Sequence, residues 1–129
     1  MRIIVEVSVG ELIDRITILE LKSERLAEEI RPFAVRELAA AREAWDRALV
    51  PCGRMAKLAE ELRRVNRELW DLEEELRQCE RFGSFDEQFV ARSRAVYKAN
   101  DRRAALKQAI DELSGGDLGD QKSYPLPSL

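Results

Sequence analysis

Two long stretches of the chain, separated by Gly83 and Ser84, repeat one apolar spacing of alternating three and four residues. The first stretch carries Met55, Leu58, Leu62, Val65, Leu69, Leu72, Leu76 and Cys79. The second carries Phe85, Phe89, Arg92, Val96, Ala99, Arg103, Leu106, Ile110 and Leu113. This spacing places each set on one side of an α-helix that faces a partner helix. The pattern therefore predicts an antiparallel hairpin of helices at about 54–81 and 85–113.

Two more helices are predicted before this hairpin. Ser8 and Glu11 form a capping box, which favours a helix start at this point, and a helix over about 9–30 follows with a broad apolar stripe. Pro32 lacks a backbone N–H and disfavours helical geometry in the residue before it, so it ends or kinks that helix. Helical spacing resumes over about 33–49. A second capping box, Ser84 to Glu87, is expected to open the last helix.

The two ends of the chain are less regular. Polar and apolar positions alternate over residues 2–7, which are rich in isoleucine and valine. This pattern favours a short strand, but a strand needs a partner strand to be stable. The tail at 114–129 has no periodicity and is expected to be a loop or the strand that pairs with the N-terminal one. The predicted fold is all-α: a single domain, 1–129, in which three long helices and a shorter one form an antiparallel bundle.

Composition narrows the classes of function. With 45% hydrophobic and 36% charged residues in a chain of 129, the sequence is typical of a soluble helical domain. A net charge of −3 gives no global attraction to nucleic acid or to an anionic membrane surface. No run approaches the roughly 18 apolar residues of a membrane span, and the N-terminus does not resemble a secretory signal. We expect a cytoplasmic protein with no nucleic-acid or membrane partner.

The chain contains no histidine, which removes the commonest general base and most zinc ligand sets. Cys52 and Cys79 form no CxxC pair, and Cys79 occupies an apolar repeat position where a buried, reduced thiol is expected. We therefore expect no metal or cofactor, and the residue types alone name no reaction.

The two flanks of the predicted hairpin differ. With the turn centred on Gly83, Arg92 comes opposite Glu73 and Arg103 comes near Glu61, so both arginines are expected to be paired structural residues, with substrate clamps as the alternative. One flank mixes large aromatic and hydrogen-bonding side chains: Asn66, Trp70, Glu73, Ser93, Tyr97, Asn100 and Lys107. On this flank Asn66 and Asn100 come out nearly opposite each other.

Such a flank is costly to leave in water and costly to bury unpaired, so another element must cover it. The helix at 9–30 is the expected cover, with Asp14, Thr17 and Glu20 as hydrogen-bond partners. Three interpretations stay open: a buried polar network, a small-molecule pocket, or a partner surface. The candidate pocket consists of Asp14, Asn66, Trp70, Tyr97, Asn100 and Lys107. Aromatic walls with a few converging polar groups suit a small molecule, and Lys107 beside Tyr97 favours an anionic group.

Four segments of the chain resemble a bacterial family classed as a domain of unknown function, number 6165. They are VSVGELIDRITILELK, VNRELWDLEEELR, FDEQFVARSRAVYKANDRRAALK and QKSY. The resemblance covers nearly all of the chain except 31–54 and implies a stand-alone bacterial protein with no established activity. The matching motif positions are Glu11, Asp14, Thr17, Glu20, Lys22, Asn66, Trp70, Glu73, Tyr97, Asn100, Asp101, Lys107, Lys122 and Tyr124. Arg15 stands where lysine is commoner in the family, which keeps the charge but not a titrating amine.

Two functions from different classes fit these observations. One is a non-enzymatic interaction or scaffold protein that forms a homodimer through apolar helix faces, because broad apolar stripes in so short a chain leave surface for a second copy. The other is a small all-α enzyme or binding protein for an anionic metabolite, with its pocket between the helix at 9–30 and the hairpin. In that second class, comparable in kind to all-α chorismate mutases, arginines and carboxylates inside a bundle bind the anion.

Overall fold

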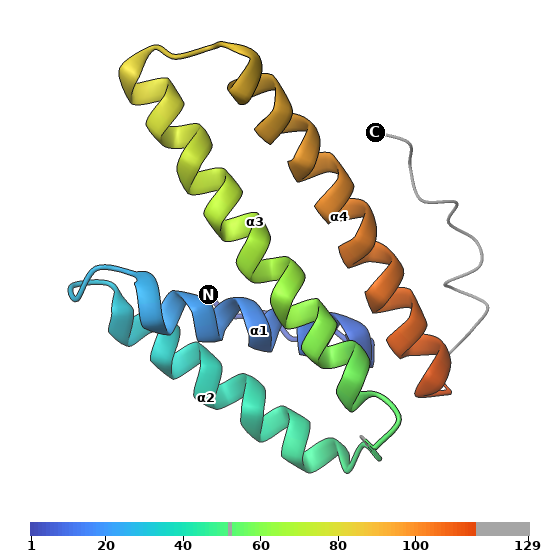
Figure 1. The fold of residues 1–129 in the computed structure, drawn as a ribbon. Helices are drawn as coiled ribbons and strands as arrows, with labels where there is room; N and C mark the ends of the chain where they lie inside the picture. Colours follow the sequence, from blue (N-terminus) through green and yellow to red (C-terminus); the bar gives the residue numbers. More distant parts are fainter. Residues whose placement is uncertain (52, 116–129) are drawn as a thin grey trace.

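The computed structural model describes residues 1–51 and 53–115, and within them the chain forms helices and no strands. The helices are α1 (Val9–Arg25), α2 (Arg31–Ala48), α3 (Ala56–Phe82) and α4 (Glu87–Leu113). Helices α3 and α4 form the predicted antiparallel hairpin, and α1 lies between α2 and this hairpin, in contact with all three other helices (Figure 1). The all-α prediction is confirmed. Instead of three long helices and a shorter one, the fold pairs two helices of 27 residues with two of 17 and 18.

Helix caps explain where the elements begin. The Ser8 hydroxyl accepts a hydrogen bond from the backbone N–H of Glu11 at 3.1 Å, which confirms the predicted start of α1. At α4 the predicted cap is wrong, because Asp86 and not Ser84 caps the helix and accepts from two backbone N–H groups of the first turn. A carboxylate at this position satisfies free N–H groups and also complements the positive end of the helix dipole.

The break between α1 and α2 comes earlier than expected. Helix α1 ends at Arg25 instead of residue 30, so the chain reverses before Pro32 is reached. Pro32 lies in the first turn of α2, where a missing N–H costs nothing because that group has no helical partner. The guanidinium of Arg31 donates two hydrogen bonds to the carbonyl of Leu26, at 3.1 and 2.9 Å. These bonds satisfy a carbonyl that the early end of α1 leaves free.

The predicted N-terminal strand is not formed. Residues 1–8 have no regular secondary structure, and Ile3, Ile4 and Val5 are exposed. A strand is stable only beside a neighbour, and the described part of the chain supplies none. Most of the expected partner, 114–129, lies outside the described residues.

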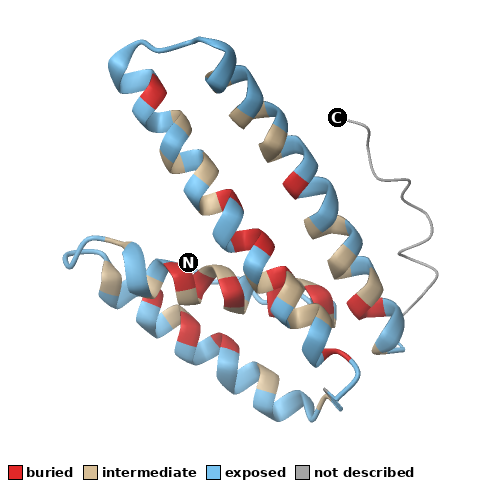
Figure 2. Ribbon diagram, in the orientation of Figure 1, coloured by how far each residue is buried: buried red, intermediate tan, exposed pale blue. Residues whose placement is uncertain are grey.

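The buried residues gather where α1 crosses the hairpin and where it packs on α2 (Figure 2). The cluster between α1 and the hairpin contains Ile13, Met55, Leu62 and Ile110, with Val65, Leu69 and Ala99 in a second cluster between α3 and α4. A third cluster joins α1 to α2 through Leu19, Leu38 and Ala41. Cys79 is buried in the hairpin, as its repeat position predicts. Helix α1 therefore contributes to the core on both of its sides.

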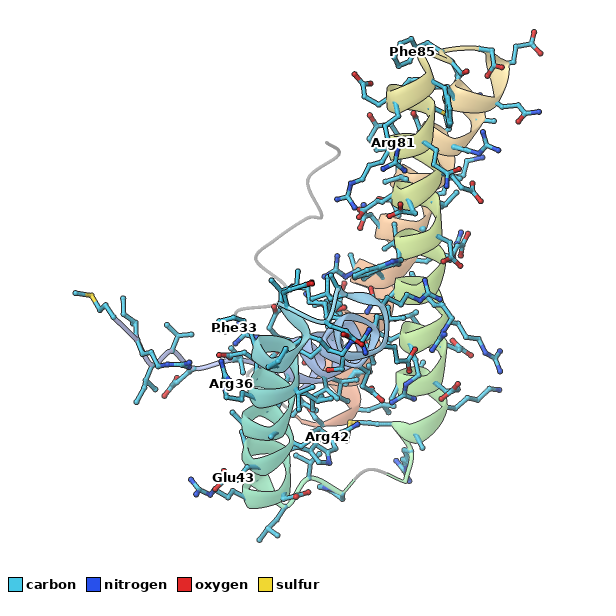
Figure 3. The ribbon with its side chains drawn as sticks, turned by 90° about the vertical axis from the view of Figure 1, so that its left-hand side faces the viewer. Phe33, Arg36, Arg42, Glu43, Arg81 and Phe85 are labelled. Carbon is cyan, nitrogen blue, oxygen red and sulfur yellow. The ribbon has the colours of Figure 1, made fainter. Side chains whose placement is uncertain are left out.

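The hairpin extends well beyond α1 and α2. In the side view of Figure 3 it rises past both helices, with Arg81 and Phe85 near its far end. The Phe85 ring packs edge-on against Phe89, with ring centroids 5.2 Å apart. None of the helices in the described part of the chain has the length and apolar content that crossing a bilayer requires.

The turn of the hairpin shifts the expected pairings. Because α3 ends at Phe82 and α4 begins at Glu87, the turn is centred between Ser84 and Phe85 and not on Gly83. The predicted pair of Glu73 with Arg92 is wrong, since Arg92 Nε lies 2.9 Å from a carboxylate oxygen of Glu75.

Candidate functional site

The centre of the candidate site is the carboxylate of Asp14 on α1, which is only 2% exposed. Arg103 of α4 donates two hydrogen bonds to this carboxylate, from Nε to Oδ1 at 2.9 Å and from Nη2 to Oδ2 at 2.6 Å. Asn66 of α3 donates from Nδ2 to the same Oδ1 at 2.9 Å. A bidentate arginine–carboxylate pair fixes both distance and orientation. Asp14 therefore ties α1 to both helices of the hairpin.

Asp14 and Arg103 each stabilise the charged form of the other. Burial opposes ionisation of Asp14, but hydrogen bonds from Arg103 and Asn66 outweigh that effect and hold the pKa of Asp14 below its ordinary value. The hydrogen bond to Asp14 raises the pKa of Arg103. Asp14 is therefore a stable carboxylate at neutral pH, poorly suited to act as a general acid or base.

Arg103 has a different partner from the one the sequence suggested. It was predicted to lie near Glu61, and that pairing is wrong because the shifted turn and the position of α1 bring it to Asp14 instead. The available signal was the interruption of an apolar stripe by a charged residue, since such a residue needs a buried counter-charge. Asp14, next to the apolar stripe of α1, is the acid that meets this requirement.

A neutral network continues from the ion pair. Asn66 Nδ2 also donates to the hydroxyl of Thr17 at 2.7 Å, and that hydroxyl donates to the backbone carbonyl of Asp14 at 2.8 Å. Asp14 and Thr17 are thus confirmed as partners from the covering helix. Glu20 pairs instead with Arg63 of α3, at 3.1 Å, and does not join this network. The prediction that Asn66 faces Asn100 is wrong, because Asn100 is exposed and Asn66 is bonded to α1.

Lys107 and Glu11 complete the charged cluster. Lys107 Nζ lies 2.5 Å from a carboxylate oxygen of Glu11 and 3.8 Å from Oδ2 of Asp14. Two acids and two bases therefore neutralise each other where α1 crosses α4. This arrangement is typical of a structural ion network and leaves little charge free for chemistry at its centre.

A close approach at Gly10 was missed in the sequence. Its backbone N–H donates to Oδ1 of the buried Asp111 at 2.6 Å, and a Cβ at Gly10 would lie 2.5 Å from the backbone oxygen of Lys107. A carboxylate at the start of a helix satisfies a free N–H and complements the helix dipole. The signal in the sequence was a glycine in the first turn of a helix, which often marks close contact with another backbone.

The structure brings together only part of the predicted pocket. Asp14, Asn66 and Lys107 meet in one cluster. Trp70, one turn beyond Asn66 on α3, is half-buried beside that cluster. Tyr97, 65% exposed, and Asn100, also exposed, lie on α4 and make no side-chain hydrogen bond with this cluster among the residues that the structure describes.

Two hollows adjoin the charged cluster. An open groove of about 780 Å³ lies between α1 and α3, and a smaller hollow of about 340 Å³ lies over Asp14. Ile18, Lys22 and Arg103 line both, so the hollows meet along α1. In the described residues, no three cysteine or carboxylate side chains are grouped closely enough to hold a metal ion.

Fold and site together define an all-α protein whose crossing helix is fixed to a long hairpin by a buried carboxylate–arginine pair. Residues 3–128 match the family described as "Family of unknown function (DUF6165)", and the chain belongs to that family. This match confirms the resemblance seen in the sequence. The comparisons found no matching curated protein and no matching solved structure.

Proposed function

We propose that the protein is a non-enzymatic interaction or scaffold protein that acts as a homodimer, joined through the part of the hairpin that α1 leaves uncovered. The observation that carries this proposal is the continuation of one helix face. Lys107 and Asp111 contact α1 from α4. Residues seven apart share a helix face, so Asn100 and Tyr97 continue this face toward the turn.

The part of this α4 face that α1 leaves uncovered has the composition of a protein–protein interface. We call it the distal face: Val90, Ser93, Tyr97 and Asn100 of α4. Val90 is 53% and Tyr97 65% exposed. Tyrosine beside aliphatic and amide groups is enriched where proteins meet, because the ring gives contact area and the polar groups give hydrogen bonds.

The charges of the hairpin favour a second copy as the occupant. Beyond Trp70, acidic side chains outnumber basic ones on α3, whereas basic side chains outnumber acidic ones on α4 up to Arg102. A two-fold axis that runs parallel to the helices between two stacked hairpins places α3 of one copy beside α4 of the other, which forms a four-helix arrangement with matched charges. Exposed pairs contribute roughly 0–1 kcal/mol each, so the charges orient the dimer and the apolar side chains supply its stability.

The mass in solution tests this proposal. Light scattering across a range of protein concentrations is expected to give a dimer that dissociates on dilution, and dilution should also lower the melting temperature. Added salt should not dissociate it, because apolar contact supplies the affinity. Tyr97→Asp should give a folded monomer, whereas Val35→Asp, at an exposed position of α2, should leave the dimer intact. A monomer at every concentration would refute the proposal.

A cytoplasmic location and a bacterial source are expectations that rest on the sequence and its resemblance to the family. The binding of an anionic small molecule is a separate function, for which a different part of the structure gives support.

A further inference from the structure

We infer that the groove between α1 and α3 binds a small molecule with a carboxylate or phosphate group on an apolar body, with the anionic group held between Lys22 and Arg103. The groove has a volume of about 780 Å³, within the range of small-molecule sites. The inference does not depend on dimer formation, because both walls of the groove belong to one copy.

The cations at the junction of the two hollows favour an anion. Lys22 forms no ion pair with any residue that the structure describes, and Arg15, one heptad earlier on α1, forms none either. The acids that line the smaller hollow with them are already engaged, since Asp14 is bonded to Arg103, Glu11 to Lys107 and Glu37 to Arg2. The ammonium group of Lys22, which has no ion-pair partner among the described residues, therefore lies where the two hollows meet.

Arg103 is prepared to receive a ligand. Its Nε and Nη2 bond Asp14, which fixes the plane of the guanidinium and leaves Nη1 outside that pair. The side chain is 30% exposed and lines both hollows. A fixed guanidinium loses little conformational freedom when it binds an anion, so its remaining N–H groups are effective donors.

The rest of the groove suits an apolar body. Apolar side chains from α1 and α3 line it: Ile18, Leu21, Leu26, Leu69 and Trp70. The other charges along the groove are largely paired, Arg25 with Asp71 at 2.6 Å and Arg77 with Glu74 at 3.9 Å. Glu73 is the acid on the opposite wall, and its presence makes a cationic ligand the alternative that the experiment must separate.

Matched fragments separate these alternatives. Nitrogen-15 NMR of the full chain follows the indole N–H of Trp70, with Trp45 of α2, which lines a different hollow, as the internal reference. Phenylacetate or phenyl phosphate is expected to shift the Trp70 signal saturably. Phenylacetamide, which has no charge, should bind at least about tenfold more weakly, since a charge-assisted contact is lost. Inorganic phosphate alone should bind more weakly than phenyl phosphate, because it lacks the apolar body.

Variants test the site itself. Lys22→Ala should weaken binding of the better anionic fragment about tenfold and leave the melting temperature unchanged, since Lys22 has no ion pair to lose. Lys98→Ala, at an exposed position on α4, is the matched control and should bind normally. Tyr97→Asp should also bind normally, so that loss of the dimer and loss of the ligand site are distinguishable.

Three results would overturn the inference. They are the absence of a saturable Trp70 shift with either anionic fragment, tighter binding of phenethylamine than of phenylacetate, and equal affinity in Lys22→Ala and the parent chain. The preference between phenylacetate and phenyl phosphate then assigns the anionic group of the ligand as a carboxylate or a phosphate.

Discussion

Removal of the Arg103 guanidinium should strongly destabilise the fold. In Arg103→Met the carboxylate of Asp14 stays buried but loses both arginine hydrogen bonds. Breaking a buried ion pair on one side costs about 3–5 kcal/mol. Asn66 still donates to Asp14, Lys107 lies 3.8 Å from it, and Arg103 is itself 30% exposed. We therefore expect the lower end of that range, about 3 kcal/mol.

A double-mutant cycle separates this pair from its surroundings. Asp14→Leu alone should cost about 2–3 kcal/mol, because it leaves Arg103 and Asn66 without their acceptor. The double variant with Arg103→Met removes both charges, so its cost should be well below the sum of the single costs. The resulting coupling energy is expected to be about 2–3 kcal/mol.

Urea unfolding followed by far-ultraviolet circular dichroism gives the four free energies, at one fixed protein concentration so that any dimer contributes equally. Equal slopes with urea across the four proteins are the control, because a changed slope would mean a changed folded or unfolded state. Additive losses, with a coupling energy below about 0.5 kcal/mol, would refute the argument that Asp14 and Arg103 stabilise the fold as a pair.

Three further predictions concern the same crossing. Gly10→Ala should destabilise the fold by about 1–3 kcal/mol, because its Cβ would meet the α4 backbone, whereas Gly53→Ala, in open space, should be neutral in the same urea titration. Asn66→Leu should cost about 2–3 kcal/mol by stranding buried partners, and Asn100→Leu less than about 0.5 kcal/mol, both measured by thermal unfolding in the Tyr97→Asp background, where no dimer contributes. The folded-state pKa of Asp14 lies below its ordinary value of 3.8, so its stabilisation is complete above that pH and is lost as the pH falls through the folded-state pKa. Urea midpoints of Asp14→Asn should therefore depend less on acid pH than those of the parent.

The periodicity of the sequence predicts the helices well because it records which side of each helix is buried. The repeat from Met55 to Cys79 identifies α3, and Ser8 identifies the start of α1. Periodicity does not fix how many residues the turn contains. Helix α4 begins at Glu87 and not at residue 85, so the turn is longer than expected. The longer turn gave Arg92 a different partner from the expected one, and it also contributed to the different partner of Arg103.

The candidate site was predictable where polar residues adjoin an apolar stripe. Asp14 and Asn66 have this position, and both are buried in the crossing. The contact of Gly10 with Asp111 was not predictable in the same way, because it depends on where α1 crosses α4. Helical spacing within one element contains no information on that crossing point.

The polar contacts of α1 explain how one crossing geometry is selected. Apolar contacts such as those of Ile13 with Leu62 and Ile110 are non-directional, so they stabilise many positions of α1 against the hairpin almost equally. Hydrogen bonds to Asp14 and Gly10 are satisfied in one position only, because Asp14, Asn66 and Asp111 are buried and would be left unpaired if α1 were displaced. The bonds from Asn66 to Asp14 and Thr17 join α1 to α3, and these two helices form the walls of the groove. The buried network and the proposed ligand groove are therefore compatible parts of one structure, because the network fixes the spacing of α1 and α3 on either side of the groove.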